Sequence, residues 1–115
     1  MRMSIDDAGM TAKINLDGRL DSAGTQAIAE RFAQLSEQKH GLVVDLAGVS
    51  YLTSAGIRQL VMAAKTMTRR GGRLVLLNPN KAVEEILAIS ATDSLIPVTR
   101  SEKEAQAVLA AALGG

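Results

Sequence analysis

Ser54, in the segment Leu52-Thr53-Ser54-Ala55-Gly56, is the residue whose type and position are best suited to chemistry. A serine that opens a helix after a strand and a loop could be the nucleophile of a hydrolase. That turn needs a glycine two positions before the serine, where this chain has Leu52. The only histidine, His40, precedes the serine, which is the wrong chain order for that class of hydrolase. We therefore expect that the protein is not an enzyme.

Metal and nucleotide sites have equally little support. Cysteine is absent and His40 is a single histidine, so neither thiolate chemistry nor a metal site is expected. Neither Gly-x-Gly-x-x-Gly nor Gly-x-x-x-x-Gly-Lys-Ser/Thr is present, and we expect no bound cofactor. A net charge of +1 and 2% aromatic residues argue against a nucleic-acid surface. No segment approaches the ~20 apolar residues of a membrane span, which predicts a cytoplasmic protein without membrane insertion.

At the start of a helix, Ser54 suits a different chemistry, the acceptance of a phosphate group. Thr53 is a good N-cap, whose hydroxyl could accept from the backbone N–H of Ala55 or Gly56. Unpaired N–H groups and the helix dipole would stabilise a phosphate on Ser54 by a few tenths to ~1 kcal/mol. The small residues Ala55 and Gly56 would let a partner's backbone approach closely, so that a phosphate would block the partner. The residues alone leave a second interpretation open, in which Thr53 and Ser54 are ordinary capping residues.

The elements that must position this segment alternate between strands and helices. Apolar and polar residues alternate over residues 10–16, which predicts a half-buried strand. This strand could pair with residues 1–5 across a turn at residues 6–9, and Asp17-Gly18 should end it. Short apolar runs predict three further strands, over residues 42–46, 73–77 and 95–98, with a connection at 47–52. Helical spacing and capping residues predict four helices, over residues 22–38, 53–70, 79–87 and 102–113. This order favours one α/β domain over residues 1–115, with a mixed, largely parallel sheet.

The second predicted helix has a well-defined apolar stripe. Five residues at helical spacing should face the core: Ile57, Leu60, Val61, Ala64 and Met67. Four residues then fall on the outer side: Ala55, Arg58, Gln59 and Met62. Together with Gly56 they form the predicted partner-binding surface, on which Met62 is a flexible apolar contact.

Three segments of the chain together closely resemble a STAS domain, the family of bacterial anti-sigma factor antagonists. They are Gly-Arg-Leu-Asp at 18–21, the long central segment 44–60, and Gly-Gly-Arg-Leu-Val-Leu at 71–76. The resemblance runs from the first strands to residue 105, nearly the whole chain. It implies a small mixed sheet of about four or five strands with about four helices packed mainly on one side.

The resemblance also implies a phosphorylation switch. In these antagonists the serine two residues before the motif glycine is phosphorylated, which is Ser54 here, and Asp21 would lie nearby and help the kinase reaction. The unphosphorylated form would bind an anti-sigma factor that is also a serine kinase with a histidine-kinase-like ATPase fold. That partner would use ATP and magnesium to phosphorylate Ser54 and so be released, and a PP2C-type phosphatase would reverse the modification. Many relatives have aspartate where this chain has Thr53, whose hydroxyl is a second possible acceptor.

One alternative stays open within the same family. The chain could be a STAS docking subunit of a larger assembly, such as a lipid-transport ABC complex or a stressosome-like scaffold. In that case the same surface would dock constitutively and Ser54 would not be modified.

Overall fold

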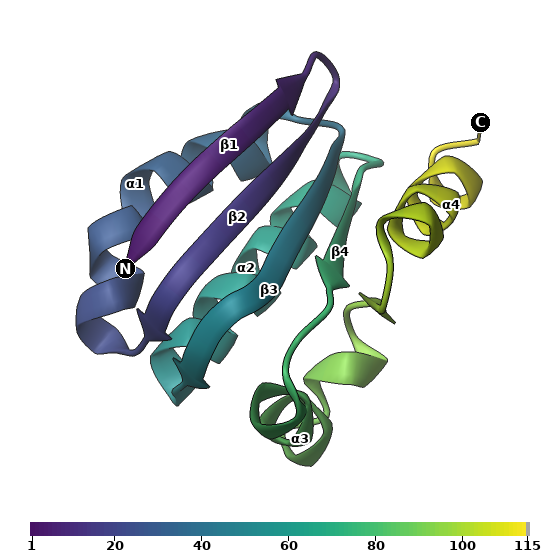
Figure 1. The fold of residues 1–115 in the computed structure, drawn as a ribbon. Helices are drawn as coiled ribbons and strands as arrows, with labels where there is room; N and C mark the ends of the chain where they lie inside the picture. The colour runs from purple at the N-terminus through teal and green to yellow at the C-terminus, as the bar shows by residue number, and fades with distance from the viewer. Residues whose placement is uncertain (115) are drawn as a thin grey trace.

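Strands and helices follow one another along the chain and build one mixed sheet with helices packed against it (Figure 1). The computed structural model describes residues 1–114, with the elements β1 (Arg2–Ala8), β2 (Thr11–Leu20), α1 (Ser22–Gln38), β3 (Gly41–Leu52), α2 (Ser54–Arg69), β4 (Arg73–Leu77), α3 (Lys81–Ile89), the 3-10 helix η1 (Thr92–Ser94), β5 (Val98–Thr99) and α4 (Glu102–Ala112). The strand order is β1-β2-β3-β4-β5, with β1 antiparallel to β2 and every later pair parallel. The predicted α/β class and mixed sheet are confirmed.

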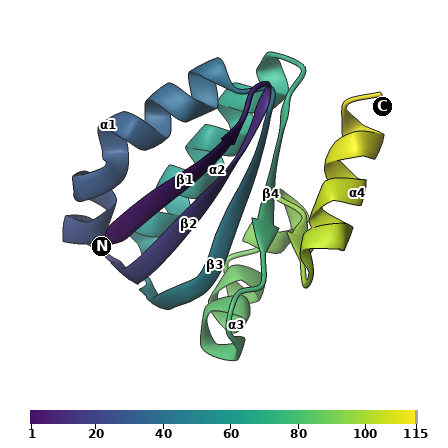
Figure 2. The same cartoon turned by 45° about the horizontal axis from the view of Figure 1, so that its top comes forward.

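The two faces of the sheet have different coverings because side chains alternate along each strand. On one face, the main core joins the strands to α1, α2 and α3 through buried residues that include Leu42, Val44, Leu74 and Leu76. On the other face, a smaller cluster joins the strands to α4: Val43, Val75, Leu77, Ala105 and Leu109. Figure 2 shows α4 across the sheet from α1 and α2. The helices therefore lie mainly on one side, as predicted, and α4 is the exception.

The two long helices follow their apolar patterns closely. Helix α1 has the predicted bounds, and α2 begins and ends within one residue of its prediction. Within the predicted stripe of α2, Leu60, Ala64 and Met67 are buried, whereas Ile57 and Val61 are only partly buried at the edge of the core. The flank of α2 that carries Val61 is thus open to solvent, unlike the flank that packs beside α1.

Three strands are longer than predicted. The strand β1 continues through residues 6–8, so the turn lies at Gly9 and Met10. The strand β2 continues past Asp17 and Gly18 to Leu20, and β3 continues through residues 47–52, with irregular register between the two. These predictions were wrong because residues 6–8 are all exposed and the register shifts between β2 and β3 interrupt the apolar alternation where those strands continue. Bulges absorb the irregular residues while the strands stay paired.

Helix α3 and strand β5 also begin later than predicted, whereas α4 begins at Glu102 as predicted. Helix α3 starts at Lys81, because Asn80 and not Asn78 is its N-cap: the Asn80 Oδ1 atom accepts from the Val83 N–H at 2.8 Å. The predicted strand at 95–98 is reduced to Val98–Thr99. Pro97, which has no N–H, bonds to β4 only through its carbonyl oxygen, which accepts from Leu76.

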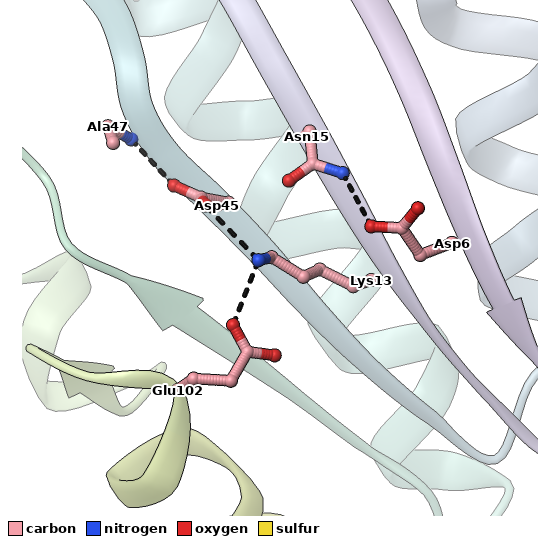
Figure 3. A network of polar contacts seen from close by, with 6 residues as sticks. All are labelled: Asp6, Lys13, Asn15, Asp45, Ala47 and Glu102. Atoms are coloured by element: carbon pink, nitrogen blue, oxygen red, sulfur yellow. Dashed lines mark hydrogen bonds and ion pairs between the residues drawn. The ribbon is translucent and has the colours of Figure 1, made fainter.

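Lys13 links three elements on the face of the sheet that α4 covers (Figure 3). Its Nζ atom lies 2.8 Å from Glu102 Oε2 in the first turn of α4 and 3.6 Å from Asp45 Oδ2 on β3. The other Asp45 oxygen accepts from the Ala47 N–H at 2.9 Å. The hydrogen bond to Glu102, and then the nearby carboxylates, raise the pKa of Lys13. This network fixes the start of α4 against the sheet.

Replacing Lys13 with methionine keeps an apolar side chain of similar length and removes the charge. We expect the free energy of unfolding at neutral pH to fall by about 1 kcal/mol, the upper range for partly exposed ion pairs. The pKa of Lys13 is raised in the folded state, so its contribution is present at neutral pH and is lost as the pH rises through the folded pKa. Urea unfolding of Lys13→Met and of Lys103→Met, the same change at an exposed residue of α4, measures the difference. Equal losses in both variants would show that the network does not fix α4.

Candidate functional site

The first turns of α1 and α2 begin side by side at one end of the sheet. Leu20 and Leu52 are the last paired residues of the parallel strands β2 and β3. The backbone N–H of Thr53 donates to the Leu20 carbonyl oxygen at 3.1 Å, and the Thr53 hydroxyl donates to the same oxygen at 3.3 Å. Asp21 and Ser54 each lie within one residue of these contacts, so the structure brings both predicted residues to the same end of the sheet.

Asp21 is the N-cap of α1. Its Oδ1 atom accepts from the Gly24 N–H at 2.9 Å, and its Oδ2 atom accepts from Arg19 Nε at 3.3 Å. The Gly24 N–H, helped by the Arg19 charge, lowers the pKa of Asp21. The carboxyl group is therefore a carboxylate throughout the neutral range.

Arg19 and Tyr51 form a contact that the sequence analysis did not identify. The two residues are paired across β2 and β3, and the guanidinium carbon of Arg19 lies 4.6 Å from the centre of the Tyr51 ring. Both side chains are well exposed. Arg19 thus contacts both the Tyr51 ring and the Asp21 carboxylate, and its positive charge lies beside the start of α1.

Ser54 is exposed as the first residue of α2. The first turn of α2 contains no acidic residue. Thr53 is the N-cap, as predicted, but the prediction that its hydroxyl accepts from the helix was wrong: the side chain makes no capping hydrogen bond, and its hydroxyl is oriented to donate to the Leu20 carbonyl oxygen. The first N–H groups of α2 are consequently not used by this cap and can serve an acceptor carried by Ser54.

Gly56 does not provide the open surface that was predicted for it. It is buried, and a Cβ atom at this position would lie 2.6 Å from the Leu20 carbonyl oxygen. The first turn of α2 therefore packs directly on the end of β2, and only glycine permits that approach. The absence of a side chain at Gly56 thus serves the packing of α2 on the sheet.

The two helix starts share a sequence as well as a position. Ser22-Ala23-Gly24 opens α1 and Ser54-Ala55-Gly56 opens α2, each directly after its N-cap. Both serines are exposed, and both glycines pack against carbonyl oxygens near the end of β2. This repeat is visible in the sequence and was not predicted. It supplies Ser22 as a matched control for Ser54.

The other predicted partner-binding residues lie together. Ala55, Arg58, Gln59 and Met62 line one groove of about 420 Å³ between α1 and α2. The Gln59 Nε2 atom donates to the Thr25 carbonyl oxygen at 3.0 Å and ties the two helices together across the groove. The Met62 side chain is 61% exposed on its rim. What this surface binds stays a prediction.

Residues 1–114 contain no cluster of histidine and acidic side chains arranged to hold a metal ion. None of the helices in this part of the chain is both long and apolar enough to cross a membrane.

Comparisons with known proteins agree on one family. A family model described as "Mlab, STAS domain" matches residues 3–97. The protein BtrV of Bordetella bronchiseptica, named as an anti-sigma factor antagonist, is 32% identical, and the match covers 98% of each chain. The solved structure of the anti-sigma factor antagonist SpoIIAA in its unphosphorylated form matches with a TM-score of 0.80 and 18% identity, over 96% of this chain and 97% of that one. The phosphorylated form of SpoIIAA, from Bacillus, matches with a TM-score of 0.72 and 18% identity, over 93% and 98%. With the fold and the family model in agreement, the chain belongs to the STAS-domain family of anti-sigma factor antagonists.

Proposed function

We propose that this antagonist is a partner switch that is set by phosphorylation of Ser54. The observation that carries the proposal is the exposed position of Ser54 at the first residue of α2. The Thr53 hydroxyl is turned toward Leu20 and leaves the N–H groups of that turn available. The chain acts here as the substrate of a kinase and as a binding partner, not as a catalyst.

A phosphate on Ser54 is compatible with the fold. The N–H groups and the dipole of α2 stabilise a negative charge at its first residue by a few tenths to ~1 kcal/mol. Ser54 is exposed, so the phosphate stays hydrated and displaces no core residue. The solved phosphorylated form of SpoIIAA, a protein of the same fold, supports this expectation.

The same phosphate is unfavourable in an interface. A surface fitted to a neutral hydroxyl has to desolvate a charge near −2 when it closes over the modified serine. A loss of ~3 kcal/mol lowers the affinity by roughly two orders of magnitude, which is enough for an on–off response. The groove between α1 and α2 begins at Ala55, next to Ser54, so a partner seated in it would meet the phosphate.

The partner in this proposal is an anti-sigma factor that is also a serine kinase with a histidine-kinase-like ATPase fold. It binds the unphosphorylated chain, transfers phosphate from ATP in the presence of magnesium, and is released. A PP2C-type phosphatase returns the chain to its binding form.

Substitutions of Ser54 test the switch directly. Ser54→Ala should bind the cognate anti-sigma factor permanently, because no phosphate can be added. Ser54→Asp should fold normally and bind at least about tenfold more weakly, an incomplete block because one carboxylate carries less charge than a phosphate. Affinity for the purified partner, and mass-spectrometric mapping after incubation with that kinase, ATP and magnesium, measure both effects.

Ser22 provides the control, since it lies at the same position of α1 with the same two following residues. Ser22→Asp should leave partner affinity much less changed than Ser54→Asp. Phosphate on Thr53 in the wild-type chain would show that Thr53, and not Ser54, is the phosphorylated residue of the switch. No phosphate on any residue, with a kinase shown to be active, would reject the switch and favour the docking-subunit alternative.

Asp21 is proposed to assist phosphoryl transfer from its position beside the start of α2. Asparagine caps a helix about as well as aspartate does, so Asp21→Asn should melt at nearly the same temperature as the wild type. Phosphorylation of Ser54 should slow by about tenfold or more, because the carboxylate is lost. A normal rate of phosphate incorporation in the variant would mean that Asp21 is only a helix cap.

Met62 tests the groove as the binding surface. Met62→Lys places a charge on the rim of the groove and should weaken partner binding by about tenfold or more. Circular dichroism and melting should be unchanged, because the side chain is 61% exposed. Ile89→Lys is the matched control, since Ile89 is 87% exposed at the end of α3 and does not line the groove. Equal affinities for the two variants would place the partner on another surface.

A further inference from the structure

A second groove lies along the flank of α2 that faces away from α1. Its volume is about 620 Å³. Its walls are α2, the start of β4 and the segment between η1 and β5, with the lining residues Val61, Ala64, Lys65, Thr68, Arg69, Arg73, Leu95 and Ile96. The first groove uses the other flank of the same helix and shares none of these residues.

The interior of the second groove is apolar. Ile96 and Ala64 are buried, and Val61 is only partly covered by the core. Leu95 is 60% exposed and stands at the edge of the groove. A hydrocarbon chain laid over Val61 and Leu95 would remove apolar surface from water on both sides of the contact.

The polar rim of the groove is basic. Lys65 and Arg69 are one helical turn apart on α2, and Arg73 follows at the start of β4. None of the eight lining residues is acidic. Within residues 1–114 the ion pairs involve other cations, so no carboxylate of the described chain neutralises Lys65 or Arg69. The rim therefore attracts an anion next to an apolar surface.

We infer that this groove binds a single-chain anionic amphiphile such as a fatty-acid carboxylate. The alkyl chain lies over Val61 and Leu95, and the carboxylate meets Lys65 and Arg69. The volume is within the range of about 300–1,000 Å³ that is typical of small-molecule sites.

This site is independent of the switch at Ser54. The amphiphile contacts the C-terminal half of α2, whereas Ser54 lies at the other end of the helix. Binding requires no kinase and no phosphate, so the experiment can fail or succeed without bearing on the proposed function.

The test uses the full ¹⁵N-labelled chain and sodium dodecanoate below its micelle threshold. We expect saturable shifts of amide signals from residues 61–69 and 95–96. Lys65→Glu and Arg69→Glu should each weaken dodecanoate binding by about threefold or more, and should strengthen binding of dodecyltrimethylammonium. Lys103→Glu makes the same charge change on α4, across the sheet, and should alter neither affinity.

Three results would overturn the inference. One is the absence of saturable shifts with dodecanoate. The second is a loss of charge selectivity, seen either as equal affinity for the anionic and cationic amphiphiles or as an equal effect of Lys65→Glu and Lys103→Glu on dodecanoate binding. Either outcome would show that the basic rim does not select an anionic head group. The third is binding to vesicles of phosphatidylcholine and phosphatidylglycerol without binding of monomeric dodecanoate, which would make this surface a membrane contact.

Discussion

The carbonyl oxygen of Leu20 accepts hydrogen bonds from both the N–H and the hydroxyl of Thr53 and so fixes where α2 begins relative to β2. Gly56 packs against the same oxygen, so the first turn of α2 lies directly on the end of the sheet. Because β2 and β3 are parallel neighbours, this contact also sets the start of α1 beside the start of α2. Ser54 is thereby held outward while Thr53 and Gly56 contact the end of β2.

This arrangement separates the chemistry of the serine from the stability of the domain. The core depends on the sheet and on the buried sides of α1 and α2, and Ser54 contributes nothing to it. A charge added at Ser54 therefore acts on the surface of the protein. The two flanks of α2 then offer different surfaces, a groove beside α1 that begins next to Ser54 and a basic, apolar groove near the C-terminal end of the helix.

The sequence predicts those parts of the fold in which local pattern and tertiary packing agree. Helix α1 and strand β4 have the predicted bounds, because the apolar face of α1 packs on the main core, β4 is buried on both faces of the sheet, and clear capping or turn residues flank both elements. The lengths of β1, β2 and β3 could not be predicted from hydrophobic pattern, since residues 6–8 are all exposed and register shifts between β2 and β3 break the alternation. The choice of Asn80 over Asn78 as the cap of α3 depends on a tertiary contact, the hydrogen bond from Asn80 Nδ2 to the Val49 carbonyl oxygen.

In the candidate site, too, some features follow from local sequence pattern and others depend on tertiary contacts. The outer residues of α2 follow from helical spacing, and the structure gathers four of them in one groove. The burial of Gly56 and the direction of the Thr53 hydroxyl do not follow from spacing, because both depend on Leu20, which is 33 residues away from Thr53 in the chain. The matching Ser-Ala-Gly segments at the starts of α1 and α2 were available in the sequence, but their equivalence becomes clear only once the two helix starts lie together.

The central claim is that a phosphate on Ser54 changes the surface of α2 and leaves the fold intact. The most direct test compares amide NMR spectra and urea unfolding of the ¹⁵N-labelled chain before and after phosphorylation. The account predicts shifts concentrated in residues 53–58, with a free energy of unfolding that is unchanged or higher by up to about 1 kcal/mol. Shifts that spread through β2, β3 and the core, together with a lower free energy of unfolding, would contradict it.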